Sequence, residues 1–237
     1  MKRTIFIGDV HGCVDELDEL LERTAYGADD RLCFVGDLVA RGPDTQGVLD
    51  RVRELDGIVV RGNHEERLLA AHRAKAQGKR GPRLGPAHHR LLRELGEVEF
   101  EYMAGLPLSY ELPDHNIRLV HGGVLPGLPF ERQSSWTLMH IRSINDDGSP
   151  SDKLGEETWA ASYQEGPHIV FGHDSRRRLQ LHENATGIDT GCVYGGKLTA
   201  IVLEANQQMP PVAEREQLMV VVDAHAQYYS GVKKKAV

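Results

Sequence analysis

One short pattern recurs along the chain and limits the folds that it can adopt. A run of β-branched or aromatic residues stops at a glycine, and a polar side chain able to bind a metal follows within a few positions. The pattern occurs in TIFIGDVHG, LCFVGD, GIVVRGNH, IRLVHGG and HIVFGHD, with TGIDTG as a weaker sixth case. Such apolar runs are typical of strands buried on both faces. A glycine at the exit lets the backbone turn sharply and lets other groups come close.

Helical patterns lie between these runs. VDELDELLER places Val14, Leu17, Leu20 and Leu21 on one face, and PDTQGVLDRVREL begins with Pro43, a residue suited to a first helical turn. EERLLAAHRAKA and HHRLLREL predict two more helices, joined by the loop QGKRGPRLGPA, and KLTAIVLE and QLMVVVDA predict late strands. The alternation predicts an α/β protein, in which ligands collect at the carboxyl ends of strands.

The overall composition favours one intracellular domain. The 237 residues show no long linker and no internal repeat, so residues 1–237 are expected to form a single domain. No apolar stretch approaches the roughly 20 residues that cross a bilayer, and the N-terminus lacks a signal-peptide pattern. The widely spaced Cys13, Cys33 and Cys192 predict buried free thiols in a reducing cytoplasm.

The charge of the chain is unevenly distributed. Residues 67–93 carry eight Lys and Arg and no Asp or Glu, so the rest of the chain carries −15 against a net charge of −7. We expect a basic helix-loop-helix cap at about residues 66–96, which either folds over the active site or is a solvated helix face. The acidic net charge and the 6% aromatic content argue against stable nucleic-acid binding.

The polar residues at the strand exits form a candidate metal site. Carboxylate oxygen, imidazole nitrogen and amide oxygen suit Mn²⁺, Fe or Zn²⁺ better than soft, thiolate-seeking metals. Any one of these residues could be a helix cap or a satisfied polar group, but capping does not explain five such exits in one chain. The residues are Asp9, His11, Asp37, Asn63, His64, His121 and His173.

The order of the motifs resembles a known family. GDVHG, GDLVARG, GNHE, a later HGG and then GH are similar to the motifs of the calcineurin-like metallophosphoesterases. Within these they resemble the phosphoprotein phosphatase group and its bacterial branch, the symmetrical bis(5′-nucleosyl)-tetraphosphatases. The motifs span residues 8–199. The resemblance implies a β-sandwich of two mixed sheets flanked by helices (αββα), with the active site at the carboxyl ends of the strands.

The resemblance also implies two divalent metal ions. Asp9 and His11 would hold the first, a second set would hold the other, and Asp37 would bridge both. The second set is Asn63, His121 and His173. Mn²⁺ is the ion that the resemblance favours, with Fe, Co²⁺, Zn²⁺ and Mg²⁺ as alternatives. A hydroxide bridging the ions would attack phosphorus in line.

Other residues are expected to handle the substrate. His64 is at the position of the family's general acid, which gives a proton to the leaving oxygen. Arg41, Arg61 and Arg142 are expected to bind phosphate oxygens with their planar guanidinium groups. Tyr194, in DTGCVYGG, either borders the pocket or packs in the core.

Two departures from the family pattern bear on the substrate. The protein serine/threonine phosphatases read GDxVDRG, with an Asp that orients the general acid, whereas this chain has Ala40 there, like the tetraphosphatases. In contrast, Arg61 in RGNHE is more like the protein phosphatases. The positive charges favour a polyanionic substrate, so we expect a diadenosine tetraphosphate hydrolase that forms two ADP.

Two other functions remain open at this point. A protein serine/threonine phosphatase acting on phosphoproteins would use the same metal site. A catalytically silent binding scaffold is the more distant alternative, since all the predicted ligands and His64 are present.

Overall fold

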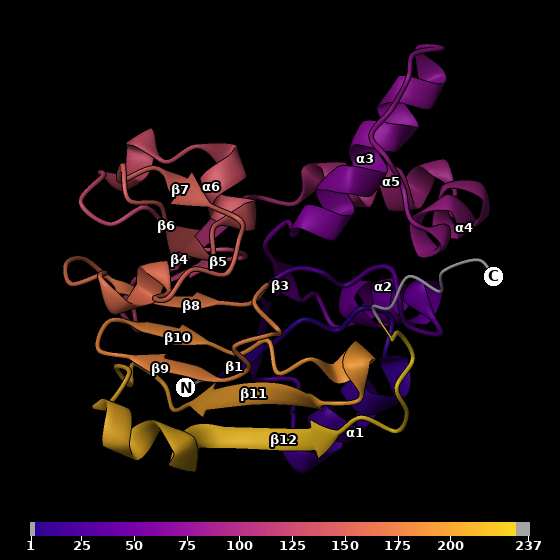
Figure 1. Ribbon diagram of the computed structural model, residues 1–237. Helices are drawn as coiled ribbons and strands as arrows, with labels where there is room; N and C mark the ends of the chain where they lie inside the picture. Colours follow the sequence, from indigo (N-terminus) through magenta and orange to yellow (C-terminus); the bar gives the residue numbers. More distant parts are fainter. Residues whose placement is uncertain (1–2, 231–237) are drawn as a thin grey trace.

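The computed structural model describes residues 3–230 and contains two five-stranded sheets packed face to face (Figure 1). The strand orders are β12-β11-β1-β2-β3 and β4-β5-β8-β10-β9, and β6 pairs with β7 in a small separate ribbon. Each five-stranded sheet mixes parallel and antiparallel pairs. The expected α/β fold with two mixed sheets flanked by helices is therefore confirmed.

The strands are short, and their bounds follow the apolar runs of the sequence. The first sheet contains β1 (Thr4–Ile7), β2 (Arg31–Phe34), β3 (Ile58–Val59), β11 (Lys197–Leu203) and β12 (Met219–Asp223). The second sheet contains β4 (Ser109–Leu112), β5 (Ile117–Val120), β8 (His168–Phe171), β9 (Gln180–His182) and β10 (Ala185–Gly187). The ribbon is formed by β6 (Ser143–Ile144) and β7 (Pro150–Ser151).

The helices are α1 (Val14–Arg23), α2 (Thr45–Glu54), α3 (Asn63–Ala76), α4 (Pro86–Glu94), α5 (Glu97–Gly105) and α6 (Ser135–His140). Helices α1 and α2 pack on the outer face of the first sheet, whereas α3, α4 and α5 contact mainly one another (Figure 1). Four 3₁₀ turns complete the fold: η1 (Phe130–Arg132), η2 (Trp159–Ala161), η3 (Cys192–Tyr194) and η4 (Val212–Leu218). No helix of residues 3–230 has the length and apolar character that crossing a membrane would require.

The buried side chains form layers on both faces of each sheet. In β1, Ile5 and Ile7 pack with α1 and α2, whereas Phe6 between them points into the layer between the sheets. In β8, Val170 joins that inner layer, and Phe171 points outward against Trp159. The strands are therefore buried on both faces, as their continuous apolar runs predicted.

The direction of the strands collects their exits at one edge. β1, β2 and β3 are parallel neighbours in the first sheet, and β5, β8 and β10 are parallel neighbours in the second. Because parallel strands end at the same edge of a sheet, the residues that follow them lie near each other.

Several helix predictions need adjustment. Pro43 does not open α2, because Asp44 is the N-cap and its carboxylate accepts a hydrogen bond from the N–H of Gly47 at 2.8 Å. The third helix starts earlier than predicted, at Asn63, which puts Asn63 and His64 in its first turn. The basic segment forms α3, the connection 77–85 and α4, and α3 projects away from the sheets (Figure 1).

Candidate metal centre

The exits of five strands, three in the first sheet and two in the second, bring the predicted residues into one buried cluster. Asp9 and His11 follow β1, Asp37 follows β2, and His121 and His173 follow β5 and β8. Asn63 and His64 follow β3 at the start of α3. In Asp9, His11, Asp37, His64, His121 and His173, at most 6% of the residue surface is exposed.

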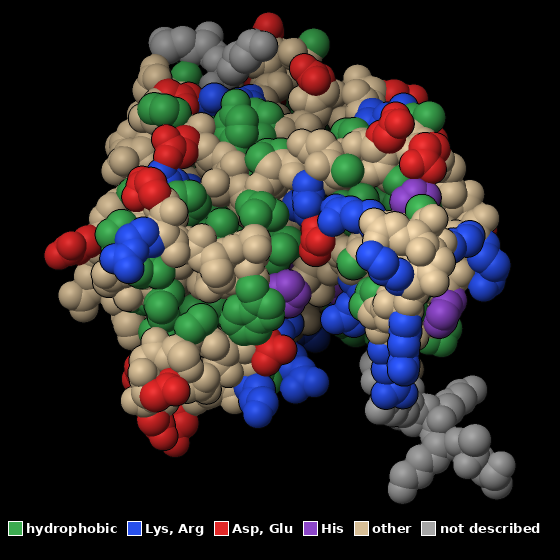
Figure 2. Space-filling view, turned by 90° about the horizontal axis from the view of Figure 1, so that it is seen from above, with side chains coloured by type: hydrophobic (Ala, Val, Ile, Leu, Met, Phe, Trp, Pro, Cys, Tyr) green, Lys and Arg blue, Asp and Glu red, His purple; other side chains and the backbone are tan. Residues whose placement is uncertain are grey.

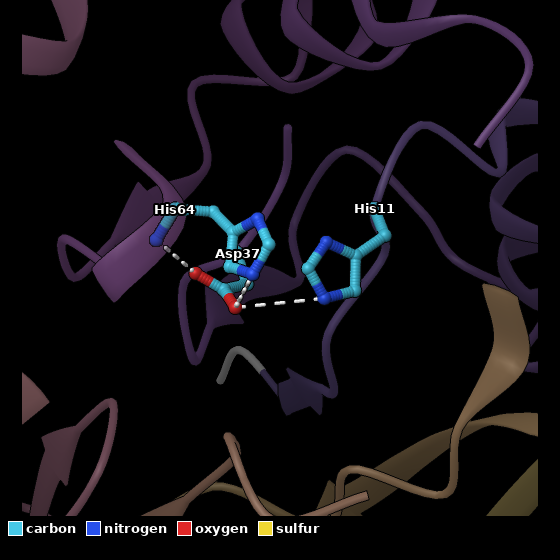
Figure 3. Close-up of side chains that lie close together, drawn as sticks. All are labelled: His11, Asp37 and His64. Atoms are coloured by element: carbon cyan, nitrogen blue, oxygen red, sulfur yellow. Dashed lines mark hydrogen bonds and ion pairs between the residues drawn. The ribbon is translucent and has the colours of Figure 1, made fainter. Parts of the chain in front are cut away.

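Asp37 lies at the centre of the cluster. Its Oδ2 is 3.5 Å from Nε2 of His11, 3.5 Å from Nε2 of His121 and 4.0 Å from Nε2 of His64. Its Oδ1 accepts a hydrogen bond from the backbone N–H of His64 at 2.9 Å (Figure 3). Asp37 belongs to both compact groups of potential ligands here, one with His11 and His64 and one with Asp9 and His121.

The backbone fixes which ring nitrogen of His11 and His121 faces Asp37. Nδ1 of His11 lies 2.9 Å from the carbonyl oxygen of Val39, and Nδ1 of His121 lies 2.8 Å from that of Val35. A carbonyl only accepts, so each Nδ1 carries the proton and, in the neutral ring, each Nε2 presents a lone pair. Two lone pairs therefore face a carboxylate oxygen.

The second group of acceptors surrounds Asn63. Nε2 of His173 lies 3.0 Å from the carbonyl oxygen of His140, so it is Nε2 that carries the proton. The unprotonated Nδ1 of His173 lies 2.9 Å from Oδ1 of Asn63, and Nε2 of His121 lies 3.1 Å from the same oxygen. A set of acceptors facing one another without a donor is what a cation site requires.

Burial sets the charge of the titratable groups. It raises the pKa of Asp37 to about 6, and with the charges of Asp189 and Asp37 it raises the pKa of Asp9 well above its usual value. Burial lowers the pKa of His121 to about 4 and the pKa of His11 well below its usual value. Burial thus disfavours the charged form of both the histidines and the carboxylates, and the charges of Arg41 and Arg142 partly offset this at Asp37.

The backbone around the cluster is locally strained. His11, Asp37, Ala40, Arg41 and His173 all have positive φ, between 49° and 71°, which is rare for residues other than glycine. Such conformations cost about 1–3 kcal/mol each and gather at functional sites.

The glycines of the motifs allow the close approach that the sequence predicted. Gly36 has a φ of +94°, and a Cβ there would lie 2.7 Å from the carbonyl oxygen of Val60. A Cβ on Gly62 would overlap Oδ1 and N of Asp37. The exits of β2 and β3 can therefore touch only because both positions are glycine.

Glu65 holds these two exits together, a role that was not predicted. It is fully buried, and its carboxylate accepts hydrogen bonds from the N–H groups of Asp37, Val39 and Gly62 at 3.0, 3.2 and 2.9 Å. The Glu of GNHE was the only sequence signal for it, and the partners of a buried carboxylate cannot be read from a motif.

Basic side chains line the cavity beside the cluster. This cavity, of about 480 Å³, is lined by Asp37, Asn63, His64 and His173, and also by Tyr194. Four cationic residues share the lining: Arg41, Arg142, Lys153 and Arg176. On the face of the molecule drawn in Figure 2, Lys and Arg side chains lie near the middle, close to a histidine. The sequence identified Arg41 and Arg142 as phosphate ligands, but it gave no signal for Lys153.

The three predicted phosphate-binding arginines differ in placement. NH1 of Arg41 donates to Nε2 of His11 at 3.0 Å, and Arg142 donates to the carbonyl oxygens of Asp152 and His173. Arg61 does not line the cavity: its guanidinium binds Glu66 at 2.9 Å and two carbonyl oxygens at the end of α5. The structure therefore groups Arg41 and Arg142 with the cluster and leaves Arg61 outside it. No residue of 67–93 lines the cavity either.

The donor set fits divalent cations. Asp37 could share a cation with His11 on one side and with Asp9 and His121 on the other, where Asn63 and His173 adjoin His121. The fit rests on the converging oxygen and nitrogen acceptors and on the burial of the Asp9 and Asp37 carboxylates.

Protons and metal ions compete for the Asp37 carboxylate, so the effect of removing the metal should depend on pH. His121, with its pKa lowered to about 4, is already neutral at pH 5.5, but Asp37, with its pKa raised to about 6, is largely protonated there and must lose its proton to bind a cation. Metal affinity therefore rises with pH. We expect a chelator to lower the melting temperature by at least about 5 °C at pH 8, and by less than half as much at pH 5.5. Equal shifts at both pH values in calorimetry would contradict this.

Comparisons with known proteins identify the family of the chain. Residues 2–207 match the family of calcineurin-like phosphoesterases. The asymmetrical bis(5′-nucleosyl)-tetraphosphatase PrpE of Halalkalibacterium halodurans is 34% identical over 219 residues, which are 82% of this chain and 87% of that protein. A symmetrical bis(5′-nucleosyl)-tetraphosphatase of Shewanella sediminis is 36% identical over 146 residues, but these are 60% of this chain and 48% of that protein.

A solved structure shows the same relationship. The crystal structure of a candidate diadenosine tetraphosphatase has a TM-score of 0.81 and 30% identity, and the match covers 94% of both chains. The expected family is confirmed, whereas the expected symmetrical branch is only one of two among the relatives. This chain belongs to the calcineurin-like phosphoesterases and is related to the bis(5′-nucleosyl)-tetraphosphatases.

Proposed function

We propose that this chain hydrolyses dinucleoside polyphosphates such as diadenosine tetraphosphate. The observation that carries the proposal is that Arg41, Arg142, Lys153 and Arg176 line the same cavity as the metal-binding cluster. A phosphomonoester on a protein presents one phosphate, whereas a dinucleoside tetraphosphate presents about four charges in a row, which four cations match better.

The proposed metal ligands are those that the sequence indicated. Asp9 and His11 would hold one divalent ion, Asn63, His121 and His173 the other, and Asp37 both, with Mn²⁺ as the favoured ion. When bound, such a pair lowers the pKa of a water molecule and neutralises charge on the phosphoryl oxygens. Nδ1–H of His11 and of His121, held by backbone carbonyls, keeps each Nε2 turned to the site.

Arg41 and Arg142 would bind the phosphate chain. Arg41 donates to Nε2 of His11 in this structure, so a cation at that nitrogen would release its guanidinium toward the cavity. The guanidinium of Arg142 donates to two backbone carbonyls, and its Nε lies 3.6 Å from Oδ1 of Asp174. These contacts fix the orientation of the Arg142 side chain. Arg61 keeps only an indirect role in this proposal, since it joins α3 to the end of α5.

His64 would donate a proton to the leaving oxygen. Burial and the charge of Arg41 lower the pKa of His64 well below its usual value, so the protonated ring is disfavoured in the free protein. The negative charge of a bound polyphosphate acts in the opposite direction and raises that pKa. Protonation of His64 would therefore accompany substrate binding.

The relatives favour one position of cleavage. The asymmetrical relative is 34% identical over 87% of its length, whereas a symmetrical relative from Vibrio campbellii, matched over 96% of its length, is only 28% identical. We therefore propose asymmetrical cleavage, to ATP and AMP, in place of the two ADP expected from the motifs alone.

Product analysis tests this function directly. The protein is incubated with diadenosine tetraphosphate and Mn²⁺, and in parallel with a serine phosphopeptide, and the nucleotides are separated by chromatography. ATP and AMP in equal amounts are expected. Two ADP would instead support the symmetrical branch, and phosphate release from the peptide alone would indicate a protein phosphatase.

The cavity cations give a second prediction. We expect the double change Lys153→Ala and Arg176→Ala to lower kcat/KM for diadenosine tetraphosphate about tenfold or more, which corresponds to about 1.4 kcal/mol. Turnover of p-nitrophenyl phosphate should fall less than about threefold, because one phosphate needs fewer cations.

Lys79 and Arg80 provide the matched control, since they carry the same charges on the connection between α3 and α4 and do not line the cavity. Their replacement by alanine should leave both substrates unaffected. An equal loss in the two double variants would mean that the basic segment closes over the substrate.

A further inference from the structure

The ring of His64 is held by other rings rather than by a hydrogen bond. Its buried Nδ1 has no hydrogen-bond partner among residues 3–230. The ring of His11 meets it edge-on at 4.7 Å and 75°, and the ring of His88 stacks on it at 4.7 Å and 30°. Ala40 offers only a methyl group, so the orientation of His64 depends on ring packing.

His88 reaches this position from the basic segment. It lies on α4 and is 6% exposed, with the buried Leu91 almost one turn further along the helix. Arg90 donates from α4 to the carbonyl oxygen of Gly42 at 3.3 Å, in the loop that also contains Ala40 and Arg41. The helix that carries His88 is thus attached to the loop beside the cluster.

Packing alone is a poor explanation for a histidine at this point. Nε2 of His88 is buried and has no hydrogen-bond partner in the described chain, and a buried unpaired polar atom costs stability. A leucine would avoid that cost and still fill the space. What His88 contributes beyond a leucine is a flat ring face against His64.

We propose that His88 is a positioning residue that keeps the imidazole of His64 in the plane needed for proton donation. The inference rests on the proposed role of His64 as general acid. With Nδ1 unpaired, the ring could turn about its Cβ–Cγ bond, and proton transfer depends steeply on such alignment. The stacked ring of His88 restricts this rotation, so one function of the basic segment is to support the acid.

Leaving-group dependence tests the proposal in the Mn²⁺-loaded full-length protein. Phenyl phosphate has a poor leaving group that needs a proton, whereas p-nitrophenyl phosphate needs little help. We expect His64→Ala to lower kcat for phenyl phosphate about 100-fold and for p-nitrophenyl phosphate less than about tenfold. His88→Ala should lower kcat for phenyl phosphate about tenfold, with less than about a threefold effect on p-nitrophenyl phosphate.

Matched variants separate positioning from structure. His88→Phe keeps the stacked face and should retain most activity on both substrates, and His89→Ala, an exposed neighbour on α4, should change neither. In the double variant His64→Ala with His88→Ala, the second change should add nothing for phenyl phosphate, since coupled residues are not additive. Melting temperatures confirm that each variant is folded under the assay conditions.

The outcomes are distinguishable. Equal loss on both substrates in His88→Ala, or full additivity in the double variant, would overturn the role of His88 while leaving His64 as the acid. Equal loss on both substrates in His64→Ala would overturn the proposed acid itself, and the positioning role with it.

Discussion

Asp37→Ala is expected to lower kcat/KM for diadenosine tetraphosphate by at least about 1000-fold, the largest effect of any single change in this chain. Among residues 3–230, Asp37 is the only one that belongs to both compact groups of potential ligands around the cluster. Its loss would leave each group without its shared oxygen. Steady-state kinetics with Mn²⁺, together with metal analysis of the purified protein, measures both consequences.

Asp37→Asn is the control for this result. It keeps an oxygen that can accept from the N–H of His64, but it removes the charge. The variant should be as inactive as Asp37→Ala. Without metal it should unfold at no lower temperature than the unaltered protein, because the buried carboxylate is itself disfavoured. Activity within tenfold of the unaltered protein would show that Asp37 does not bridge two ions.

Glu65→Ala is expected to cause the largest loss of stability. The change leaves three buried N–H groups, of Asp37, Val39 and Gly62, without an acceptor. At about 1–3 kcal/mol for each unpaired group, the free energy of unfolding should fall by about 3 kcal/mol or more. Calorimetry should show a drop of about 6–12 °C for a chain of this length.

The neighbouring Glu66 provides the comparison. It is partly exposed and pairs with Arg61 and Arg73, so Glu66→Ala should cost less than about 1 kcal/mol. Similar losses for the two variants would mean that Glu65 does not tie the exits of β2 and β3 together.

The clustering of these residues could be predicted from the sequence because the direction of the strands determines which residues lie together. The exits of parallel strands must meet at one edge, so Asp9, Asp37, His121 and His173 could be grouped although up to 164 positions separate them. A glycine directly before Asp9, Asp37 and His173, and directly after His121, marked where the chain turns. The type of each element at the site therefore followed from local pattern.

The roles of individual side chains were harder to predict. Arg61 lies two positions before Asn63, but its side chain turns to Glu66 and to carbonyl oxygens more than 40 positions away. Lys153 reaches the cavity from a loop with no motif. His88 stacks on His64, which lies 24 positions earlier, but the sequence around His88 indicated only a basic helical segment. Sequence proximity fixes where a backbone is, and packing decides where a long side chain points.

The central claim is that this cluster holds two divalent ions that share Asp37. Anomalous diffraction from a crystal grown with Mn²⁺ tests it most directly. The account predicts two manganese peaks on either side of the Asp37 carboxylate, one beside Asp9 and His11 and the other beside Asn63, His121 and His173. A map without manganese at this cluster, or with one ion that Asp37 does not touch, would contradict it.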